Sequence, residues 1–216
     1  MQDKKTFFTR KIMKWGQDNY RDFIWRKQKT NFFTVFVAEF LLRRTRAESV
    51  NKFLMGFLKK YKSFDDLIPI PLRVLTSELR ALGLQNERAK ALKEIALYAS
   101  NKKNLTYEEI MDLPYCGRYM ANAIECFYRG RRNAIVDNNI QRVFNRYFSV
   151  SKAVEIHKAD YLWNLAFELL PPKEYVQYNF HLLDFSALVC TPKKEASGIC
   201  PIKSRCDFAS SMGLDK

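Results

Sequence analysis

The hydrophobic pattern of the chain is helical along most of its length. Apolar residues recur at intervals of three and four in the segment 50–61, where they would share one face of a helix: Val50, Phe53, Leu54, Phe57, Leu58 and Tyr61. The segment 162–169 repeats this spacing and is followed by two prolines, which end helices. A third stripe over 75–82 ends at Gly83, a typical residue just beyond a helix. No convincing alternation of apolar and polar positions occurs, so the pattern predicts an all-α fold.

Polar positions add a short helix, a hairpin and an isolated carboxylate. Thr106 and Glu109 have the spacing of a capping box, which predicts a short helix before the segment Leu-Pro-Tyr-Cys-Gly-Arg-Tyr at 113–119. That segment reads as a tight hairpin that opens another helix, and the free backbone N–H groups of such a helix start suit a DNA phosphate. Asp137 follows eighteen residues after Tyr119. A carboxylate held near the hairpin could stabilise a positive charge that develops there.

Composition narrows the class of protein only modestly. The 216 residues are 47% hydrophobic, enough for one large core or two small ones, and their formal charge of +14 favours a polyanionic partner. Basic proteins are common, however, so charge alone is weak support for nucleic acid. The chain shows neither an apolar signal region nor a membrane-spanning run, so we expect an intracellular protein of the cytoplasm or nucleoid, without a membrane partner. Five cysteines in such a chain argue against a disulfide framework.

The hairpin and the carboxylate, with Arg142 five residues after Asp137, resemble the helix-hairpin-helix DNA glycosylases of the endonuclease III and adenine glycosylase superfamily. The resemblance extends from about Phe23 to Cys206. It implies two helical lobes, a six-helix lobe over 30–133 that contains the hairpin, and a second lobe formed by 1–29 plus 134–216.

The resemblance also implies which parts of the hairpin bind DNA. Gly117 and Arg118 would contact phosphates, and hairpin carbonyls would hold a monovalent cation. Tyr115 stands where the family normally has glycine, which reaches positive φ at little cost. This tyrosine must therefore accept backbone strain or shift the turn, which affects the phosphate and cation geometry.

Asp137 is the expected catalytic anion. Removal of a base passes through an oxocarbenium-like sugar and requires that the nucleotide first be flipped out of the duplex. Asp137 could instead be an ordinary helix N-cap, and both roles are compatible because a capped carboxylate is expected to keep a low pKa. Asn139 matches a family asparagine that helps hold the carboxylate and the sugar or phosphate.

The residue at position 119 determines the type of chemistry. Bifunctional family members carry a lysine there, whose amine forms a Schiff base that leads to strand cleavage. Tyr119 is a phenol with a pKa near 10, so lyase activity is not expected. Adenine glycosylases usually have serine here, whereas tyrosine is similar to the mismatch thymine glycosylases, where the ring lines the pocket for a flipped pyrimidine. The alternative is a tyrosine of the core.

A second carboxylate and two DNA-contacting segments complete the expected site. Glu39 lies in an apolar helix, where burial should raise the pKa of its carboxyl group and allow proton exchange with a base or water, unless it is paired with an arginine. By resemblance, Arg44 fills the gap left in the duplex, and the segment with Leu84 and Gln85 forms a wedge. Leu84 could equally be an unremarkable exposed leucine.

The C-terminal cysteines depart from the family pattern Cys-x6-Cys-x2-Cys-x5-Cys, which holds a 4Fe–4S cluster. Cys190, Cys200 and Cys206 occupy the first, third and fourth places, and Ser197 occupies the second. One thiolate ligand is therefore missing. Serine oxygen could bind iron, a 3Fe–4S cluster could form, or the site could be empty; we expect an iron–sulfur cluster in a C-terminal loop.

Together these features predict a monomeric, monofunctional DNA glycosylase that removes thymine or uracil opposite guanine, using Glu39 and Asp137 for hydrolysis. Its partner would be double-stranded DNA with a flipped base. Two alternatives remain: an adenine DNA glycosylase that acts opposite oxidised guanine, and a DNA damage-binding module without catalysis.

Overall fold

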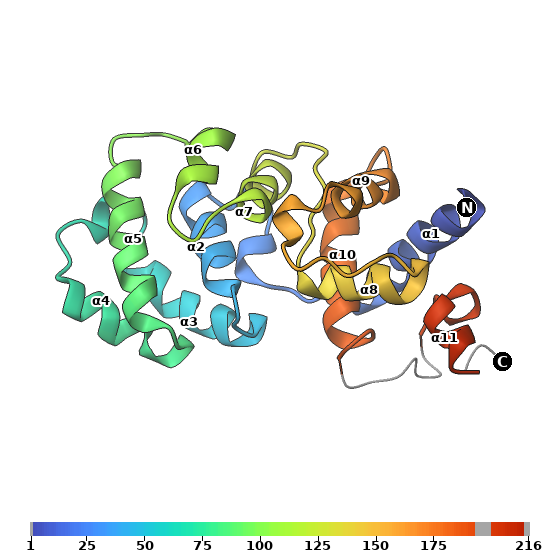
Figure 1. Cartoon of the computed structure of the whole chain (residues 1–216). Coiled ribbons are helices and arrows are strands. Elements are labelled where there is room, and N and C mark those ends of the chain that lie inside the picture. Colours follow the sequence, from blue (N-terminus) through green and yellow to red (C-terminus); the bar gives the residue numbers. More distant parts are fainter. Residues whose placement is uncertain (1, 193–199, 214–216) are drawn as a thin grey trace. The chain divides into compact units, whose positions relative to one another are not determined.

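The computed structural model describes residues 2–192 and 200–213, and within these ranges it contains helices and no strand, as Figure 1 shows. The predicted all-α fold is confirmed. None of the described helices is both long enough and apolar enough to cross a membrane.

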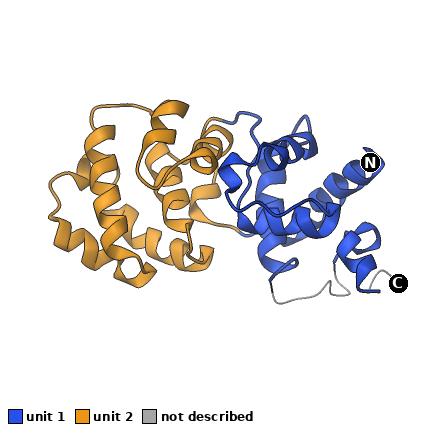
Figure 2. Ribbon diagram, viewed as in Figure 1, with its two compact units in different colours: residues 1–21, 130–216 blue, residues 22–129 orange. Residues whose placement is uncertain are grey.

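The chain forms two compact units, coloured separately in Figure 2. Unit 2 is the continuous segment 22–129, and unit 1 combines residues 1–21 with 130–216. The lobes were expected to change at residues 30 and 133. Unit 2 begins earlier because Phe23 and Trp25 are buried in the same core as its helices.

Unit 2 is built around a helix that is apolar on every side. Its helices are α2 (Phe32–Leu42), α3 (Ala47–Lys60), α4 (Leu72–Leu79), α5 (Gln85–Ala99), α6 (Tyr107–Asp112) and α7 (Arg118–Ala123), with 3₁₀ turns η1 (Ile24–Arg26), η2 (Asp65–Leu67) and η3 (Arg80–Leu82) and a π-helical turn η4 (Ile124–Tyr128). Nine of the eleven residues of α2 are buried, as expected for a helix without a polar face. Helix α2 packs against α3, α7 and η4, and this packing fixes the position of Glu39.

Three local predictions for unit 2 can be compared with these elements. The stripe over 50–61 is confirmed as α3, and the capping box at Thr106 is confirmed at the start of α6. The stripe over 75–82 is not one continuous α-helix, because α4 ends at Leu79 and the 3₁₀ turn η3 follows. Gly83 then reverses the chain with φ 72°. Tightening of the last turn is a common way to satisfy the final carbonyls of a helix.

Unit 1 joins the two ends of the chain. Its helices are α1 (Gln2–Asn19), α8 (Asn138–Phe148), α9 (Asp160–Leu169), α10 (Tyr175–Leu188) and α11 (Asp207–Ser211), with 3₁₀ turns η5 (Ile156–Lys158) and η6 (Lys203–Arg205). The predicted stripe over 162–169 is confirmed as α9. Helix α10 is central, since both α1 and α8 pack against it, and α11 packs on α8 (Figure 1).

Candidate active site

In unit 2 a buried carboxylate lies next to the tyrosine that was expected to determine the chemistry. Glu39 is only 4% exposed, in the middle of α2. Tyr119, in the first turn of α7, donates its hydroxyl to Glu39 Oε2 at 3.0 Å. Tyr119 is partly exposed, so it is not a tyrosine sealed in the core. The structure therefore brings together two of the three predicted catalytic residues, although they are eighty positions apart in the chain.

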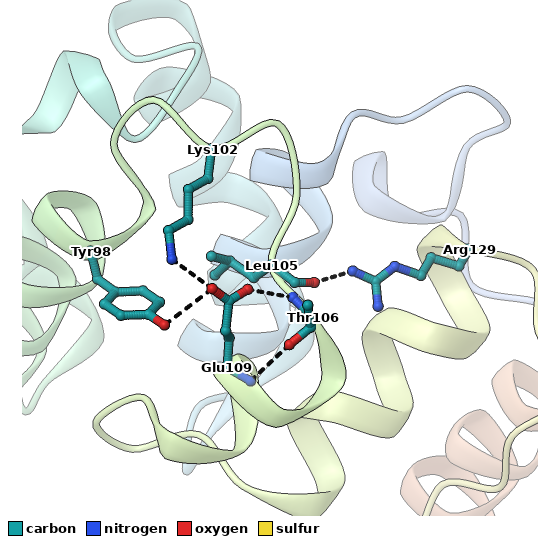
Figure 3. Close-up of polar contacts among 6 residues, drawn as sticks. All are labelled: Tyr98, Lys102, Leu105, Thr106, Glu109 and Arg129. Carbon is teal, nitrogen blue, oxygen red and sulfur yellow. Dashed lines mark hydrogen bonds and ion pairs between the residues drawn. The ribbon is translucent and has the colours of Figure 1, made fainter.

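Helix α6, which precedes the hairpin, is fixed at its N-terminal end by the polar contacts drawn in Figure 3. Thr106 Oγ1 accepts the N–H of Glu109, and the Glu109 carboxylate accepts the N–H of Thr106 in return. The hydrogen bond from Lys102, followed by that from Thr106, lowers the pKa of Glu109 to about 2. Arg129 donates to the carbonyl of Leu105 just before the cap. These contacts fix the short helix α6, whose six residues would be marginal alone.

The hairpin itself contains two residues with positive φ. Gly117, the N-cap of α7, has φ 132°, which favours glycine although no atom crowds its Cα. Tyr115 has φ 61°, so this tyrosine adopts the left-handed conformation expected of the family glycine. The backbone at Tyr115 is therefore strained, at a cost of about 1–2 kcal/mol.

The Tyr115 ring is half-exposed and has a cationic neighbour. The guanidinium of Arg43 lies over it, 5.0 Å from the ring centroid. Such cation–π contacts contribute about 0.5–1 kcal/mol at exposed sites. This contact offsets part of the strain and joins the hairpin to the end of α2.

The two segments expected to enter the duplex also have left-handed backbone. Arg44 has φ 57° in the turn after α2, and Leu84 has φ 50° at the N-cap of α5. Both side chains are exposed, Leu84 by 44%, while Gln85 begins α5 and is partly exposed. Both turns lie in unit 2.

In unit 1, Asp137 is the N-cap of α8, as predicted. Its Oδ1 accepts the backbone N–H groups of Asn139 and Ile140 at 2.9 and 2.7 Å, and its Oδ2 accepts the Asn139 amide at 3.0 Å. The expected low pKa is wrong. Burial raises the pKa of Asp137 above its usual value, and the hydrogen bonds from Ile140 and Asn139 and the nearby charge of Arg142 only reduce this effect.

The support of Asp137 continues through two further side chains of α8. Asn139 Oδ1 accepts a hydrogen bond from Arg142 Nη1 at 2.9 Å. Arg142 also donates to the backbone carbonyls of Ser186 and Cys190, both at 2.8 Å. Asn139 thus holds the Asp137 carboxylate, and Arg142 holds Asn139 against the end of α10.

The three C-terminal cysteines converge. Cys190, Cys200 and Cys206 line one cavity together with apolar side chains of α8 and α10. Ser197 lies outside the described residues. Burial raises the pKa of the Cys200 thiol to about 11, and the neighbouring Cys206 and Cys190 add to this rise.

The three thiols have the donor type that an iron–sulfur cluster needs. Backbone N–H groups of Ile202 and Lys203 oppose the rise in the pKa of the Cys200 thiol that burial causes, and those of Phe208 and Ala209 do the same for Cys206, as suits cluster thiolates. Within the described ranges no three His, Cys, Asp or Glu side chains are close enough to hold a single metal ion. Three thiols that line one cavity are the residue type that binds iron–sulfur clusters, so Cys190, Cys200 and Cys206 are the residues that would hold one.

Comparison with known proteins identifies the family. The model of the HhH-GPD superfamily of base excision DNA repair proteins matches residues 37–170. This chain belongs to that superfamily.

HhH-GPD relatives of the chain include glycosylases of different specificity. The chain is 36% identical to the thymine/uracil-DNA glycosylase of Methanothermobacter thermautotrophicus, over 95% of this chain and 94% of the relative. It is 27% identical to the adenine DNA glycosylase of Rattus norvegicus, over 96% of this chain but only 43% of that protein. The structure of a thermostable thymine-DNA glycosylase superposes with a TM-score of 0.88 at 33% identity, covering 97% of this chain and 98% of the other. The expected resemblance is confirmed.

The fold of this HhH-GPD protein is also that of endonuclease III. A non-covalent endonuclease III–DNA complex matches 99% of this chain and 98% of that chain, with a TM-score of 0.86 at 19% identity.

Sequence reasoning missed two functional candidates in this HhH-GPD protein. The position of Arg43 over the Tyr115 ring had no signal in the sequence, because it joins segments far apart in the chain. Arg88 is 5% exposed in α5, and its buried contacts were not predicted either. The only available signal was a charged residue between apolar positions of α5.

Proposed function

We propose that this protein is a monofunctional DNA glycosylase that removes thymine or uracil mispaired with guanine. The observation that carries the proposal is the 3.0 Å hydrogen bond between Tyr119 and Glu39. A phenol bound to a carboxylate occupies the position at which a Schiff-base mechanism needs an amine. The similarity to thymine/uracil-DNA and thymine-DNA glycosylases over nearly the whole chain supports the same substrate class.

Asp137 is the proposed anion for the departing base. Its carboxylate would stabilise the positive charge that the deoxyribose acquires as the glycosidic bond breaks. Three hydrogen bonds from Asn139 and Ile140 hold it in one orientation, so little reorganisation would be needed during the reaction. Because burial raises the pKa of Asp137, this anion would be active only above an unusually high pH for an aspartate.

Glu39 and Tyr119 are proposed to act on the base and the water. The Tyr119 ring would line the pocket of the flipped pyrimidine, and its hydroxyl would orient the Glu39 carboxyl group. Glu39 would then exchange a proton with the attacking water or the departing base, a role typically worth 10²–10⁴-fold in rate.

DNA contact is proposed for six residues of this chain: Arg44, Leu84, Gln85, Gly117, Arg118 and Asn139. The duplex would bind with its target nucleotide flipped out, to a monomer acting on DNA in the cytoplasm or nucleoid. The net charge of +14 supports this, since each neutralised phosphate releases counterions and makes binding depend on salt.

A 4Fe–4S cluster held by Cys190, Cys200 and Cys206 is proposed as the cofactor, with no fourth cysteine in the family register. Such a cluster would join Cys190, just after α10, to Cys200 and Cys206. Iron and sulfide content of anaerobically purified protein, with its EPR spectrum, distinguishes four irons from three. Protein with less than one iron per chain would contradict the proposal.

The function is tested by base excision from end-labelled duplexes. Substrates contain G·T, G·U or adenine opposite oxidised guanine, with and without alkali treatment. Product from G·T or G·U that appears only after alkali is expected. Excision of adenine alone would move the activity to adenine repair, and strand breaks without alkali would require an amine nucleophile that we have not identified. Tight binding without any product would favour a damage-binding module.

A further inference from the structure

A buried arginine connects the two turns that carry Arg44 and Leu84. Arg88 extends from α5, and only 5% of its surface is exposed. Its Nη1 donates to the carbonyls of Leu82 and Gly83 at 2.8 and 3.0 Å. Its Nη2 lies within hydrogen-bonding distance of three acceptors of the other turn: the carbonyls of Leu41 at 3.2 Å and Arg43 at 2.6 Å, and Thr45 Oγ1 at 2.7 Å.

These acceptors flank the two exposed residues directly. Arg43 and Thr45 are the neighbours of Arg44, and Gly83 is the neighbour of Leu84. Arg44 and Leu84 both have left-handed φ, a conformation that costs a non-glycine residue about 1–2 kcal/mol. Conformations of this kind persist only where the surroundings hold them. Arg88 supplies such a hold to both turns at once.

Arginine is the residue type best suited to holding several backbone carbonyls at once. Its planar guanidinium presents several N–H donors in a fixed fork, so the acceptors around it are held at fixed mutual distances. Its burial is costly, since desolvation, together with the charge of Arg43, lowers the pKa of Arg88. Five neutral acceptors and no carboxylate among these contacts indicate that the group organises backbone rather than forming an ion pair.

The connection extends to the hairpin. Arg43, whose carbonyl is bound by Arg88, also lies over the ring of Tyr115. The end of α2, the start of α5 and the hairpin before α7 are thus linked through one buried side chain and one exposed stack, all within unit 2.

We propose that Arg88 is a positioning residue that holds the Arg44 and Leu84 turns in register with each other, so that both side chains enter the duplex together when the target base leaves the stack. The inference rests on the proposed DNA function. It predicts that Arg88 affects base extrusion and excision more than duplex binding, since Arg88 is too buried to contact phosphates.

The test compares Arg88→Met, which keeps the apolar stem and removes the fork, with Arg88→Lys, which keeps the charge but not the fork geometry. Lys90→Met is the matched control, because it removes one positive charge from an exposed position of the same helix. Three quantities are measured: Kd for the duplex, the fluorescence rise of a 2-aminopurine placed beside the target base, and the single-turnover excision rate. Thermal melting checks that each variant is folded.

Arg88→Met is expected to lower the rate of fluorescence rise and of excision together, by roughly 10²-fold, the size of effect that a displacement of about 1 Å can have. Kd should change less than about threefold, Arg88→Lys should be intermediate, and Lys90→Met should resemble wild type. Should Arg88→Met fail to fold, Arg88→Lys decides by the same split between Kd and rate.

Two results would overturn the inference while leaving the proposed function intact. One is wild-type extrusion and excision in the folded Arg88 variant. The other is an equal loss in Kd and rates, which a general structural defect would produce. If wild-type protein itself neither excises a pyrimidine nor raises the fluorescence, the proposed function fails, and the role assigned to Arg88 fails with it.

Discussion

Asp137 illustrates how a single residue combines a structural and a chemical role. It caps α8 with a carboxylate whose pKa is raised by burial, although part of its surface remains exposed. Ionising a carboxyl group in surroundings that favour its neutral form lowers the stability of the fold. The resulting anion can stabilise a positive charge that develops during the reaction.

Asp137→Asn is therefore expected to separate activity from stability. Excision should fall by at least roughly 10³-fold, because the anion is lost. The folded-state pKa lies above the unfolded one, so the folded state binds more protons in the interval between them, and wild-type stability declines as pH rises through that interval. The melting temperature of the variant should consequently equal or exceed that of wild type at pH 7, and this advantage should shrink toward pH 4.

The rate of wild-type excision should likewise fall with acid at a pH above the usual range of aspartate pKa values. An active Asp137→Asn enzyme, or a stability advantage that grows in acid, would contradict this account of Asp137.

Tyr115→Gly tests the strain at the hairpin. Glycine adopts φ 61° at little cost, so the hairpin backbone that we propose to face phosphate should keep its geometry. Loss of the Arg43 contact offsets the strain relief, and the unfolding free energy should change by less than about 1 kcal/mol. Kd for undamaged duplex should remain within about twofold. A large loss of binding would show that the ring itself contacts DNA.

At the scale of elements, α1 and α10 approach each other too closely for any side chain at position 16. A Cβ at Gly16 would lie 2.0 Å from Cγ of His181, whereas one at Gly56 in α3 would meet nothing within 4 Å. Gly16→Ala should therefore destabilise the protein by about 1–3 kcal/mol or more. Gly56→Ala, the matched control, should stabilise it by about 0.4–1 kcal/mol. Denaturant unfolding measures the free energy of unfolding of both variants. Equal changes in the two would show that α1 can move away from α10 without loss of stability.

The short helix α6 depends on its cap. Thr106→Ala removes the acceptor for the Glu109 N–H and should lower the unfolding free energy by about 1 kcal/mol. Because the pKa of Glu109 is depressed to about 2, its contribution is present above about pH 4.5 and lost as pH falls toward 2. Thr106→Ala keeps the backbone N–H and the Lys102 ammonium that Glu109 accepts, so its deficit in denaturant unfolding should be similar at pH 7 and in acid. Ser77→Ala, at an exposed position of α4, should show no deficit at either pH.

Local features of this fold could be predicted from the sequence, and longer-range ones could not. The α3 and α9 stripes and the Thr106 cap depend on residues three or four apart, so spacing alone indicates them. The direction of the Asp137 pKa shift depends on everything that surrounds it, and a capping pattern says nothing about burial. The conformation of Tyr115 could not be predicted for the same reason, because a tyrosine at this position is compatible with a strained left-handed backbone or with a shifted turn.

The candidate site was predictable to a similar degree. A family spacing indicated Glu39, Tyr119 and Asp137 as separate residues, but the Tyr119–Glu39 hydrogen bond joins two helices that are distant in the chain. Arg88 was missed because its partners are mostly backbone carbonyls, which have no sequence signature.

At the scale of the whole molecule, unit 2 is one continuous segment, whereas unit 1 is made of two. This division predicts that unit 2 can fold alone and that residues 130–216 cannot. Unit 2 contains its own buried core and both turns held by Arg88, so a fragment of residues 22–129 should fold alone. We expect a helical circular dichroism spectrum and a cooperative melt from it. A fragment of residues 130–216 should lack such a melt until a peptide of residues 1–21 is added, because α1 covers α10. A fragment 22–129 without a cooperative transition would contradict this division.

The pairing of α1 with α10 also sets an order of events during synthesis on the ribosome. Helix α1 is translated before unit 2 and its partner α10 after unit 2, so Phe8 and Ile12 have no native surface to cover them while unit 2 is being made. Unit 2 can complete its own core in that interval. The nascent chain consequently carries a helix with an uncovered apolar face while unit 2 is already complete. The five basic residues of α1 give this helix a charged face that keeps it in solution until translation reaches α10.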